Sequence, residues 1–286
     1  MQTAILFVST VLIWGTTWIA IAAEVGEAPV FVSIFYRFAL SGVVMVAGLA
    51  LLGRLKQPSH WRFVVLQALC LFSFNFIGLY NATASIPSGL VSVVFSLASI
   101  FNAVNARLFF GDRINPQTLL AGALGVCGLT LLFWHDLAVG FDPQTLAGLA
   151  WAVMGTIFFS FGNMASRKNS ALGITPIVAN SWGMGIGATV VLVLIALRGE
   201  TLVVPASVSY WTALVYLAVI GSVVGFTTYL MLVARIGSAR AGYATVLFPI
   251  VALTLSTLFE GYEWTATAFA GVLLAGLGNI VMFARR

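Results

Sequence analysis

The sequence predicts an all-α integral membrane protein whose ten transmembrane helices form two inverted five-helix repeats. Hydrophobic residues make up 61% of the 286 residues and charged residues only 7%. A typical soluble domain is about 25% charged, so this chain cannot cover a water-facing surface, and a soluble enzyme is excluded. Continuous apolar runs of spanning length and a match between the two halves of the chain predict the number of helices and the repeat.

Five apolar runs are expected to cross the membrane in the first half of the chain. One crossing takes roughly 20 apolar residues in a helix. The breaks between the runs contain charged residues, Pro or Gly, which are typical of turns. The expected spans are 3–23, 30–52, 61–83, 88–110 and 116–134, and the breaks are Glu24–Pro29, Arg54–His60, Ile86–Ser88 and Gly111–Pro116.

The second half repeats this pattern. Its expected spans are 144–165, 175–197, 209–232, 238–259 and 264–284, with breaks at His135–Pro143, Arg167–Gly173, Arg198–Ser207, Arg235–Ser238 and Glu260–Glu263. Ten spans use roughly 210 residues, which leaves short loops and no room for a soluble domain. We therefore expect a first five-helix repeat over residues 1–138 and a second over residues 139–286.

Basic residues gather on one side of this topology. The even-numbered loops and the C-terminal tail hold Arg54, Lys56, Arg62, Arg107, Arg113, Arg167, Lys168, Arg235, Arg240, Arg285 and Arg286, whereas the odd loops hold Arg198. Cytoplasmic loops are enriched in Lys and Arg, so both termini are expected in the cytoplasm and the protein in a plasma membrane, with the bacterial inner membrane favoured. The net charge of +5 then reflects orientation, not nucleic-acid binding. Arg37 lies well inside a span, and its side chain is expected to reach toward the outer interface.

A shift of 150 residues places the fourth and fifth spans on the ninth and tenth. Leu108-Phe109 meets Leu258-Phe259, Gly111 meets Gly261, Leu124 meets Leu274, Gly128 meets Gly278, and Phe133 meets Phe283. Leu- and Gly-rich helices can match by chance, but these matches keep one register across two helices and a loop. Because five is odd, the second repeat must start on the opposite side of the membrane. Such inverted repeats are typical of secondary transporters, whose substrate site lies near the midplane between the halves.

Two groups of motifs resemble a known family. The run Ile13-Trp14-Gly15-Thr16-Thr17-Trp18-Ile19-Ala20-Ile21, followed by Tyr36-Arg37-Phe38, resembles the start of EamA-type members of the drug/metabolite transporter superfamily. That family closes each half with a Pro, an acid and two spaced glycines. Pro249, Gly271, Gly278, Asp112 and Gly128 fit this pattern, whereas Ser99, Ala121 and Tyr262 depart from it. The resemblance implies ten helices in two fives, and the neutral, aromatic-rich helices look most like YddG-type exporters of aromatic amino acids.

Small polar side chains mark the expected substrate cavity. In the fourth span, Ser92, Ser96 and Ser99 share one helix face, and Asn102 lies beside it. Tight helix packing is the alternative explanation for small residues, whereas an amide in hydrocarbon must face protein or a wet cavity. The predicted polar contacts to substrate are Asn75, Ser96, Ser99, Asn102 and Thr228.

Aromatic residues away from the span edges are predicted to form the apolar walls of this cavity. They are Trp18, Tyr80, Phe158 and Trp182, and ordinary packing is the alternative for each.

Pro249 lacks the N–H that would bond to the carbonyl of Thr245, so it loosens the ninth span and is predicted to act as a hinge. A purely structural kink is the alternative explanation.

No Asp or Glu lies within the expected spans and no Lys or Arg lies at a midpoint, so we expect a cavity without net charge. The sequence shows no catalytic set, phosphate loop or metal cluster, so we expect no catalytic residue, metal or cofactor.

The expected partners are the lipid bilayer and a neutral or zwitterionic small molecule with an apolar body. The sequence thus predicts a secondary transporter that works by alternating access and exports aromatic or hydrophobic amino acids. A drug or general metabolite exporter is the nearest alternative, and a channel or an integral-membrane enzyme is the alternative from another class.

Overall fold

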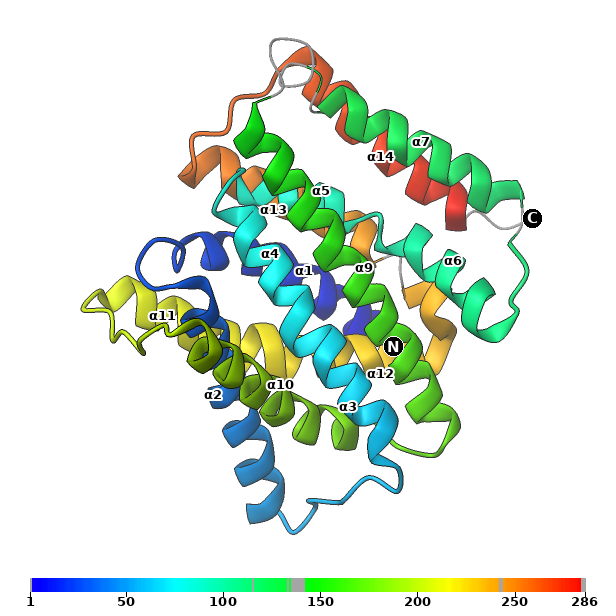
Figure 1. Ribbon diagram of the computed structural model, residues 1–286. Helices are drawn as coiled ribbons and strands as arrows, with labels where there is room; N and C mark the ends of the chain where they lie inside the picture. The colour runs from blue at the N-terminus through cyan, green and yellow to red at the C-terminus, as the bar shows by residue number, and fades with distance from the viewer. Residues whose placement is uncertain (1, 115, 133, 135–141, 242–243, 284–286) are drawn as a thin grey trace.

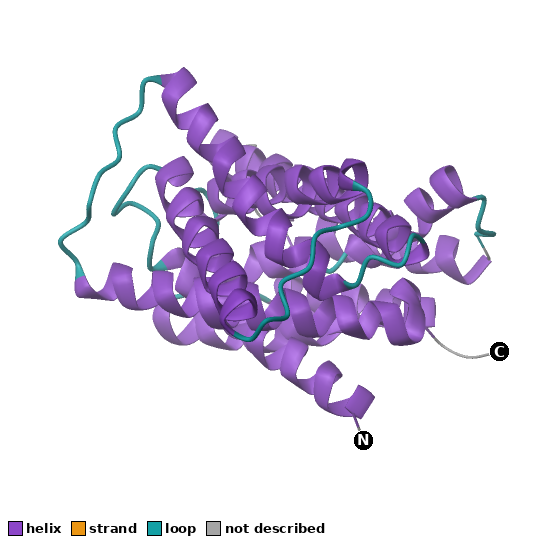
Figure 2. Cartoon of the chain, turned by 90° about the horizontal axis from the view of Figure 1, so that it is seen from below, coloured by secondary structure: helices purple, strands orange, loops and turns teal. Residues whose placement is uncertain are grey.

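The protein is described by a computed structural model over residues 2–114, 116–132, 134, 142–241 and 244–283. Helices and their connecting loops make up this part of the chain (Figure 2). Within it, no β-strand forms, and the only β-type pairing is an isolated bridge between Val25 and Ala28. The boundary expected between residues 138 and 139, and the tail residues Arg285 and Arg286, lie outside the described residues.

The helices follow the expected order of spans in both halves (Figure 1). The first half contains α1 (Gln2–Ala22), α2 (Val30–Leu51), α3 (Trp61–Leu69), the π-helix η1 (Cys70–Phe74), α4 (Asn75–Thr83), α5 (Ser88–Phe95), α6 (Ala98–Phe110) and α7 (Pro116–Leu132). The second half contains α9 (Pro143–Ala171), α10 (Pro176–Arg198), α11 (Val208–Tyr216), the π-helix η2 (Leu217–Val224), α12 (Gly225–Ala241), α13 (Ala244–Phe259) and α14 (Ala266–Phe283).

Seven helical stretches of the described chain are long and apolar enough to cross a membrane. They are Gln2–Ala22, Val30–Leu51, Trp61–Thr83, Ser88–Phe110, Pro143–Ala171, Pro176–Arg198 and Val208–Ile236. Shorter apolar helices over 119–132, 247–259 and 266–278 correspond to the expected fifth, ninth and tenth spans. The break expected at Arg235–Ser238 is wrong, because α12 continues through it to Ala241. Its signals were Arg235 and Gly237, which a helix tolerates far better than a proline.

The expected fourth span is not one continuous helix, because the chain turns at Ser96 and Leu97 between α5 and α6. The hydroxyls of Ser92 and Ser96 donate to the carbonyls of Gly89 and Val93, three residues back. Hydrogen bonds of this type compete with the helical ladder and bend helices. The third and eighth spans are also irregular, because η1 and η2 each follow a nine-residue α-helix, α3 and α11.

Glycines in the left-handed conformation end segments at matching positions in the two halves. Gly26 and Gly173, Gly53 and Gly199, and Gly111 and Gly261 all have positive φ and lie 147, 146 and 150 residues apart. At Gly111 and Gly199 the glycine is the C-cap of a helix, where side chains other than hydrogen would be strained. The same kind of glycine turn therefore recurs in the second half of the chain, 146 to 150 residues after its counterpart in the first half.

The helices α7 and α14 pack side by side at one edge of the molecule (Figure 1). A Cβ on Gly128 would lie 2.7 Å from the carbonyl oxygen of Gly271, and a Cβ on Gly278 would lie 2.8 Å from that of Ala121. The late part of each helix thus meets the early part of the other, so the two run antiparallel. The family glycines act here by letting two backbones approach closely.

The remaining contacts between helices also occur in matching pairs. In the first half α1 packs on α12 and α13, and in the second half α9 packs on α4, α5 and α6. The helix α2 contacts η2 and α10, while α10 contacts α2, α3 and η1. These helices enclose one main core, in which Trp14, Trp18, Phe72, Phe159 and Phe248 are buried.

Candidate functional site

A small internal cavity lies where the two halves meet. Its volume is about 30 Å³. The lining residues are Trp14, Thr17, Trp18, Ile21, Arg37, Asn75, Phe76, Leu79, Phe95, Phe159, Phe226 and Phe248. They come from the first, third, fourth, sixth, eighth and ninth expected spans, with Arg37 added from α2. A space of this size holds about one or two water molecules, so a larger ligand requires the surrounding helices to move.

Aromatic rings form most of the cavity wall and contact one another. Trp14 packs on Phe226 and Tyr229, with ring centroids 5.1 and 4.7 Å apart. Trp18 stacks on Phe248 at 5.9 Å and meets Phe95 edge-on at 5.5 Å. Offset and edge-on contacts of this kind are the favourable geometries between aromatic rings. A cavity with such walls suits a flat apolar group.

Arg37 brings a positive charge to this wall, which differs from the expectation of a cavity without charge. Its side chain is 2% exposed, and its guanidinium lies 4.4 Å from the centroid of the Phe76 ring. Nε donates to Ser222 at 2.9 Å and Nη1 donates to the hydroxyl of Tyr80 at 3.4 Å. The side chain turns inward, not toward the outer interface, because α2 carries it on the face that packs on η2 and α4. A buried charge is stable only when such partners are supplied.

Glu24 is a functional candidate that the sequence pattern alone does not reveal. It lies in the loop after α1, is fully buried, and accepts a 2.7 Å hydrogen bond from the hydroxyl of Tyr80. Burial raises the pKa of Glu24 from its ordinary 4.5 to about 7, although the Tyr80 hydrogen bond and the charge of Arg37 both lower it. The sequence showed only a loop acid beside a span. The signal that could have found it is that Arg37 and Tyr80 both lie in the outer halves of their expected spans without an assigned partner, close to the span end that Glu24 follows.

Amide side chains form two further buried networks. Gln67 donates to Asn180 at 3.2 Å and accepts from Asn169 at 2.9 Å, which ties α3 to α10 and α9. Near the aromatic cluster, Asn163 donates to Asn102 at 3.3 Å and to the hydroxyl of Tyr229 at 3.4 Å. The side-chain oxygen of Asn102 thus finds its polar partner in protein, on α9, while its amide nitrogen is buried with no hydrogen-bond partner among the described residues.

Among the residues predicted to contact substrate, Trp18 and Asn75 line the cavity. The Asn75 amide nitrogen donates to Leu71, while its oxygen has no hydrogen-bond partner among the described residues. Tyr80 lies behind the cavity, between Arg37 and Glu24. Ser96 and Ser99 direct hydroxyls to carbonyls of their own segment, at Val93 and Ser96.

Phe158, Trp182 and Thr228 do not line the cavity. Phe158 lies in outward grooves of α9 and packs on Phe74 at 5.2 Å, while its neighbour Phe159 faces the cavity. Successive helix residues are about 100° apart, so an error of one position selects a different face of the helix. Trp182 lies near the start of α10, where its Nε1 donates to the carbonyl of Lys56 at 2.8 Å, as an interfacial anchor would. Thr228 lies in α12 just after η2, and its hydroxyl donates to the carbonyl of Val224, four residues back in the chain.

Pro249 lies inside α13, directly after the cavity residue Phe248. Two residues further on, Val251 packs against Gly15 of α1, where a Cβ would lie 2.7 Å from that of Val251. The glycine of the Trp-Gly pair thus permits close contact with the proline-containing helix. Pro249 therefore lies between a residue that lines the cavity, Phe248, and one that contacts α1, Val251.

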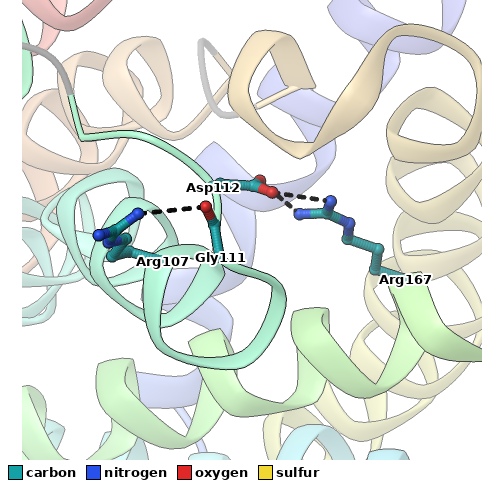
Figure 3. A network of polar contacts seen from close by, with 4 residues as sticks. All are labelled: Arg107, Gly111, Asp112 and Arg167. Carbon is teal, nitrogen blue, oxygen red and sulfur yellow. Dashed lines mark hydrogen bonds and ion pairs between the residues drawn. The ribbon is translucent and has the colours of Figure 1, made fainter.

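Asp112, which matches the acid of the family pattern, is remote from the cavity and forms an ion pair. Arg167 donates to its two carboxylate oxygens at 2.6 and 3.1 Å, and Arg107 donates to the carbonyl of Gly111 at 3.2 Å (Figure 3). The hydrogen bond from Arg167 lowers the pKa of Asp112 below its ordinary value. The ionised carboxylate of Asp112, just after α6, is therefore paired with Arg167 of α9.

The sequence model of the EamA-like transporter family matches residues 1–134 and 146–284. The chain belongs to the EamA-like transporter family. It is a multi-pass membrane transporter rather than an enzyme, with a small-molecule substrate. Within the described residues, no group of three or more His, Cys, Asp or Glu side chains could hold a metal ion.

Relatives of this EamA-like transporter cover nearly the whole chain. The uncharacterized inner membrane transporter YedA of Escherichia coli strain K12 is 26% identical over 288 residues, which span 96% of this chain and 90% of YedA. A probable amino-acid metabolite efflux pump of the same strain is 23% identical over 291 residues, spanning 96% and 92%. A crystal structure with 18% sequence identity superposes with a TM-score of 0.71 over 99% of this chain and 98% of the other. The last comparison shows that the fold is one already seen in a crystal.

Proposed function

We propose that the chain is a secondary transporter built from two inverted five-helix repeats, residues 1–138 and 139–286, with ten membrane spans. The two separate matches of the family model support two repeats. The three glycine pairs with positive φ, spaced 146 to 150 residues apart, support the same division. So do the π-helices η1 and η2, which interrupt corresponding spans.

The packing of α7 on α14 supports the inversion. With a shift of 150 residues, Gly128 corresponds to Gly278 and Ala121 corresponds to Gly271. The approach of Gly128 to Gly271 then maps onto the approach of Gly278 to Ala121, as a twofold axis requires. Equivalent helices that run antiparallel are related by an axis in the membrane plane, since an axis along the membrane normal would keep them parallel. Inverted repeats of this kind place the substrate site between the halves.

We propose that this site binds an aromatic or hydrophobic amino acid, in the manner of YddG-type exporters. The observation that carries the proposal is a cavity with seven aromatic side chains and one guanidinium, that of Arg37. The guanidinium matches a substrate carboxylate, and the unpaired oxygen of Asn75 can accept from the ammonium group. An aromatic ring stacked on the walls gains about 0.5–1.5 kcal/mol beyond area burial. The name of the efflux pump of E. coli supports an amino-acid metabolite as substrate.

We place the protein in a bacterial inner membrane with both termini in the cytoplasm. The relative YedA is named an inner membrane transporter. The excess of basic residues on the even loops supports the orientation. With this orientation, Glu24 lies at the outer end of the bundle and the amides of Gln67, Asn169 and Asn180 lie at the inner end. The cavity between them is too small for substrate, which fits an occluded step of alternating access.

Counterflow in proteoliposomes tests this function. Vesicles loaded with unlabelled phenylalanine should take up labelled phenylalanine transiently against its gradient, which an alternating-access carrier produces and a channel does not. Phenylalanine and tryptophan should compete better than alanine, and glutamate and lysine should compete poorly. If a sugar phosphate or glutamate were the best competitor, the aromatic amino acid would be the wrong substrate. If a hydrophobic drug cation outcompeted every amino acid, the drug-exporter alternative would replace it.

A further inference from the structure

Four segments meet around the carboxyl group of Glu24. Its own loop follows α1, α4 supplies Tyr80, α2 supplies Arg37, and η2 supplies Ser222 as a second partner of Arg37. All four of these residues are buried. The hydrogen bonds run in series from Glu24 through Tyr80 and Arg37 to Ser222, so the carboxyl is linked to a residue that lines the cavity. A change in the charge or position of the Glu24 carboxyl therefore alters the hydrogen bonds of Arg37 at the cavity wall.

One oxygen of the Glu24 carboxyl accepts a hydrogen bond and the other has no partner among the described residues. Oε2 accepts from Tyr80, whereas Oε1 is buried with no hydrogen-bond partner among the described residues. An ionised carboxylate distributes its charge over both oxygens and needs donors at each, while a protonated carboxyl needs fewer. A second donor at Oε1 would have stabilised the ionised form. Without one, burial favours the protonated carboxyl.

The charged and titratable groups around Glu24 are few. Arg37 of α2 and Tyr80 of α4 interact with it directly, and Tyr210 of α11 interacts with it electrostatically. One cation and two phenols therefore face the carboxyl, and no second acid or histidine shares a proton with it among these partners. The pKa of about 7, set first by burial, places its titration near neutral pH. Glu27, three residues on in the same loop, is exposed.

We propose that Glu24 is a proton-binding site of the transport cycle, protonated while its contact with Tyr80 is closed and ionised when helix movement exposes it to water. The O–H bond of the carboxyl breaks in that step, and the proton passes to water at the end of the bundle where α1 ends. The reverse step returns a proton as the contact closes. The inference rests on the proposed transport function, because a cycle of opening and closing must exist for the proton to be exchanged.

Infrared difference spectroscopy of the purified full-length protein in lipid nanodiscs tests the site without any substrate. Between about pH 5 and about pH 9, the carbonyl stretch of a protonated carboxylic acid should disappear with a midpoint of about 7. The signal should be missing in Glu24→Gln and unchanged in Glu27→Gln. In Tyr80→Phe the midpoint should rise, since the lost hydrogen bond had favoured the ionised form. An identical titration in Glu24→Gln, or no such signal in the native protein, would overturn the proposal.

Proton flux tests the coupling itself. With a pH-sensitive dye inside proteoliposomes, downhill movement of phenylalanine should change the internal pH for the native protein and for Glu27→Gln, and should lose this change for Glu24→Gln. Substrate-driven flux that persists in Glu24→Gln would refute the coupling. If no amino acid moves but the infrared titration of Glu24 is present, the proposed substrate fails and the proton site stands.

Discussion

Gly128 of α7 and Gly271 of α14 approach so closely that a Cβ on either would lie within 2.7 Å of the other's carbonyl oxygen. Neither position can accept a side chain unless one backbone moves. The contact recurs at Gly278, so α7 and α14 are joined at two equivalent places. The two helices therefore pack backbone against backbone at the edge of the molecule.

Gly128→Ala is expected to destabilise the protein by about 1–3 kcal/mol, the usual range for overpacking a tight contact. Gly122→Ala in the same helix is the matched control, because its Cβ would meet only a side-chain atom at 3.9 Å. That control should be neutral or slightly stabilising, since Ala favours a helix over Gly. Thermal unfolding in detergent measures both, and equal midpoints would contradict the close contact.

Pro249→Ala is expected to slow transport more than it weakens binding. Restoring the missing backbone hydrogen bond stiffens α13 next to Phe248 and hinders exchange between access states. Ile250→Ala, at an exposed neighbouring position, is the control. Initial counterflow rates and ligand affinity should be compared on the same preparations. Native turnover in Pro249→Ala would leave the proline with a structural role alone.

Arg37→Gln should weaken phenylalanine binding much more than binding of phenethylamine, which lacks the carboxylate. Loss of a buried charge partner typically costs about 2–5 kcal/mol, so the affinity ratio of the two ligands should fall at least about thirty-fold. Using the ratio within one variant removes general effects of the mutation on folding. A ratio unchanged from the native protein would show that Arg37 does not meet the carboxylate.

Glu27→Cys and Lys56→Cys should report opposite sides of the membrane. Both positions are exposed, and they lie in the loops after α1 and α2. In a Cys127→Ser background, since Cys70 is buried and Cys127 exposed, an impermeant maleimide should label intact cells at residue 27 and not at residue 56. Labelling of both after permeabilisation shows that each thiol is reactive. The reverse pattern would invert the proposed orientation.

Asp112→Asn should lower stability by less than about 1 kcal/mol, because the pair with Arg167 is largely exposed. The lowered pKa of Asp112 means that its contribution is present above the ordinary pKa of an aspartate and is lost as the pH falls. The native protein and the variant should therefore unfold at similar temperatures in acid and differ at neutral pH. Glu263→Gln, an exposed acid of another loop, serves as control. A difference that persisted in acid would assign the effect to something other than the charge.

The sequence predicted the membrane class and the order of the helices because these follow from hydrophobic run length and from turn residues. The side chains that face the cavity were harder to predict, because the direction of a side chain depends on its rotation about the helix axis. Trp18 of α1, which is a regular helix, lines the cavity, whereas Thr228, which follows the π-helix η2, does not. Nothing in the local sequence marks the length of such a π-helix.

Glu24 and Arg37 were assigned to the outer surface for a related reason. Loop acids usually face water, and a long charged side chain inside a span usually extends toward the nearer interface. In this protein Tyr80, 43 residues after Arg37, supplies a buried partner for both. A partner so distant in sequence follows only from the packing of α4 against α2.

The place of Arg37 has an electrical consequence. It lies within the span Val30–Leu51, so while Glu24 is neutral the bundle carries an uncompensated positive charge inside the membrane. A full elementary charge crossing the membrane potential changes energy by about 2.3 kcal/mol per 100 mV. If α2 moves even a fraction of that distance between access states, the resting potential of the cell will favour one state over the other, and turnover will depend on voltage even for a substrate with no net charge.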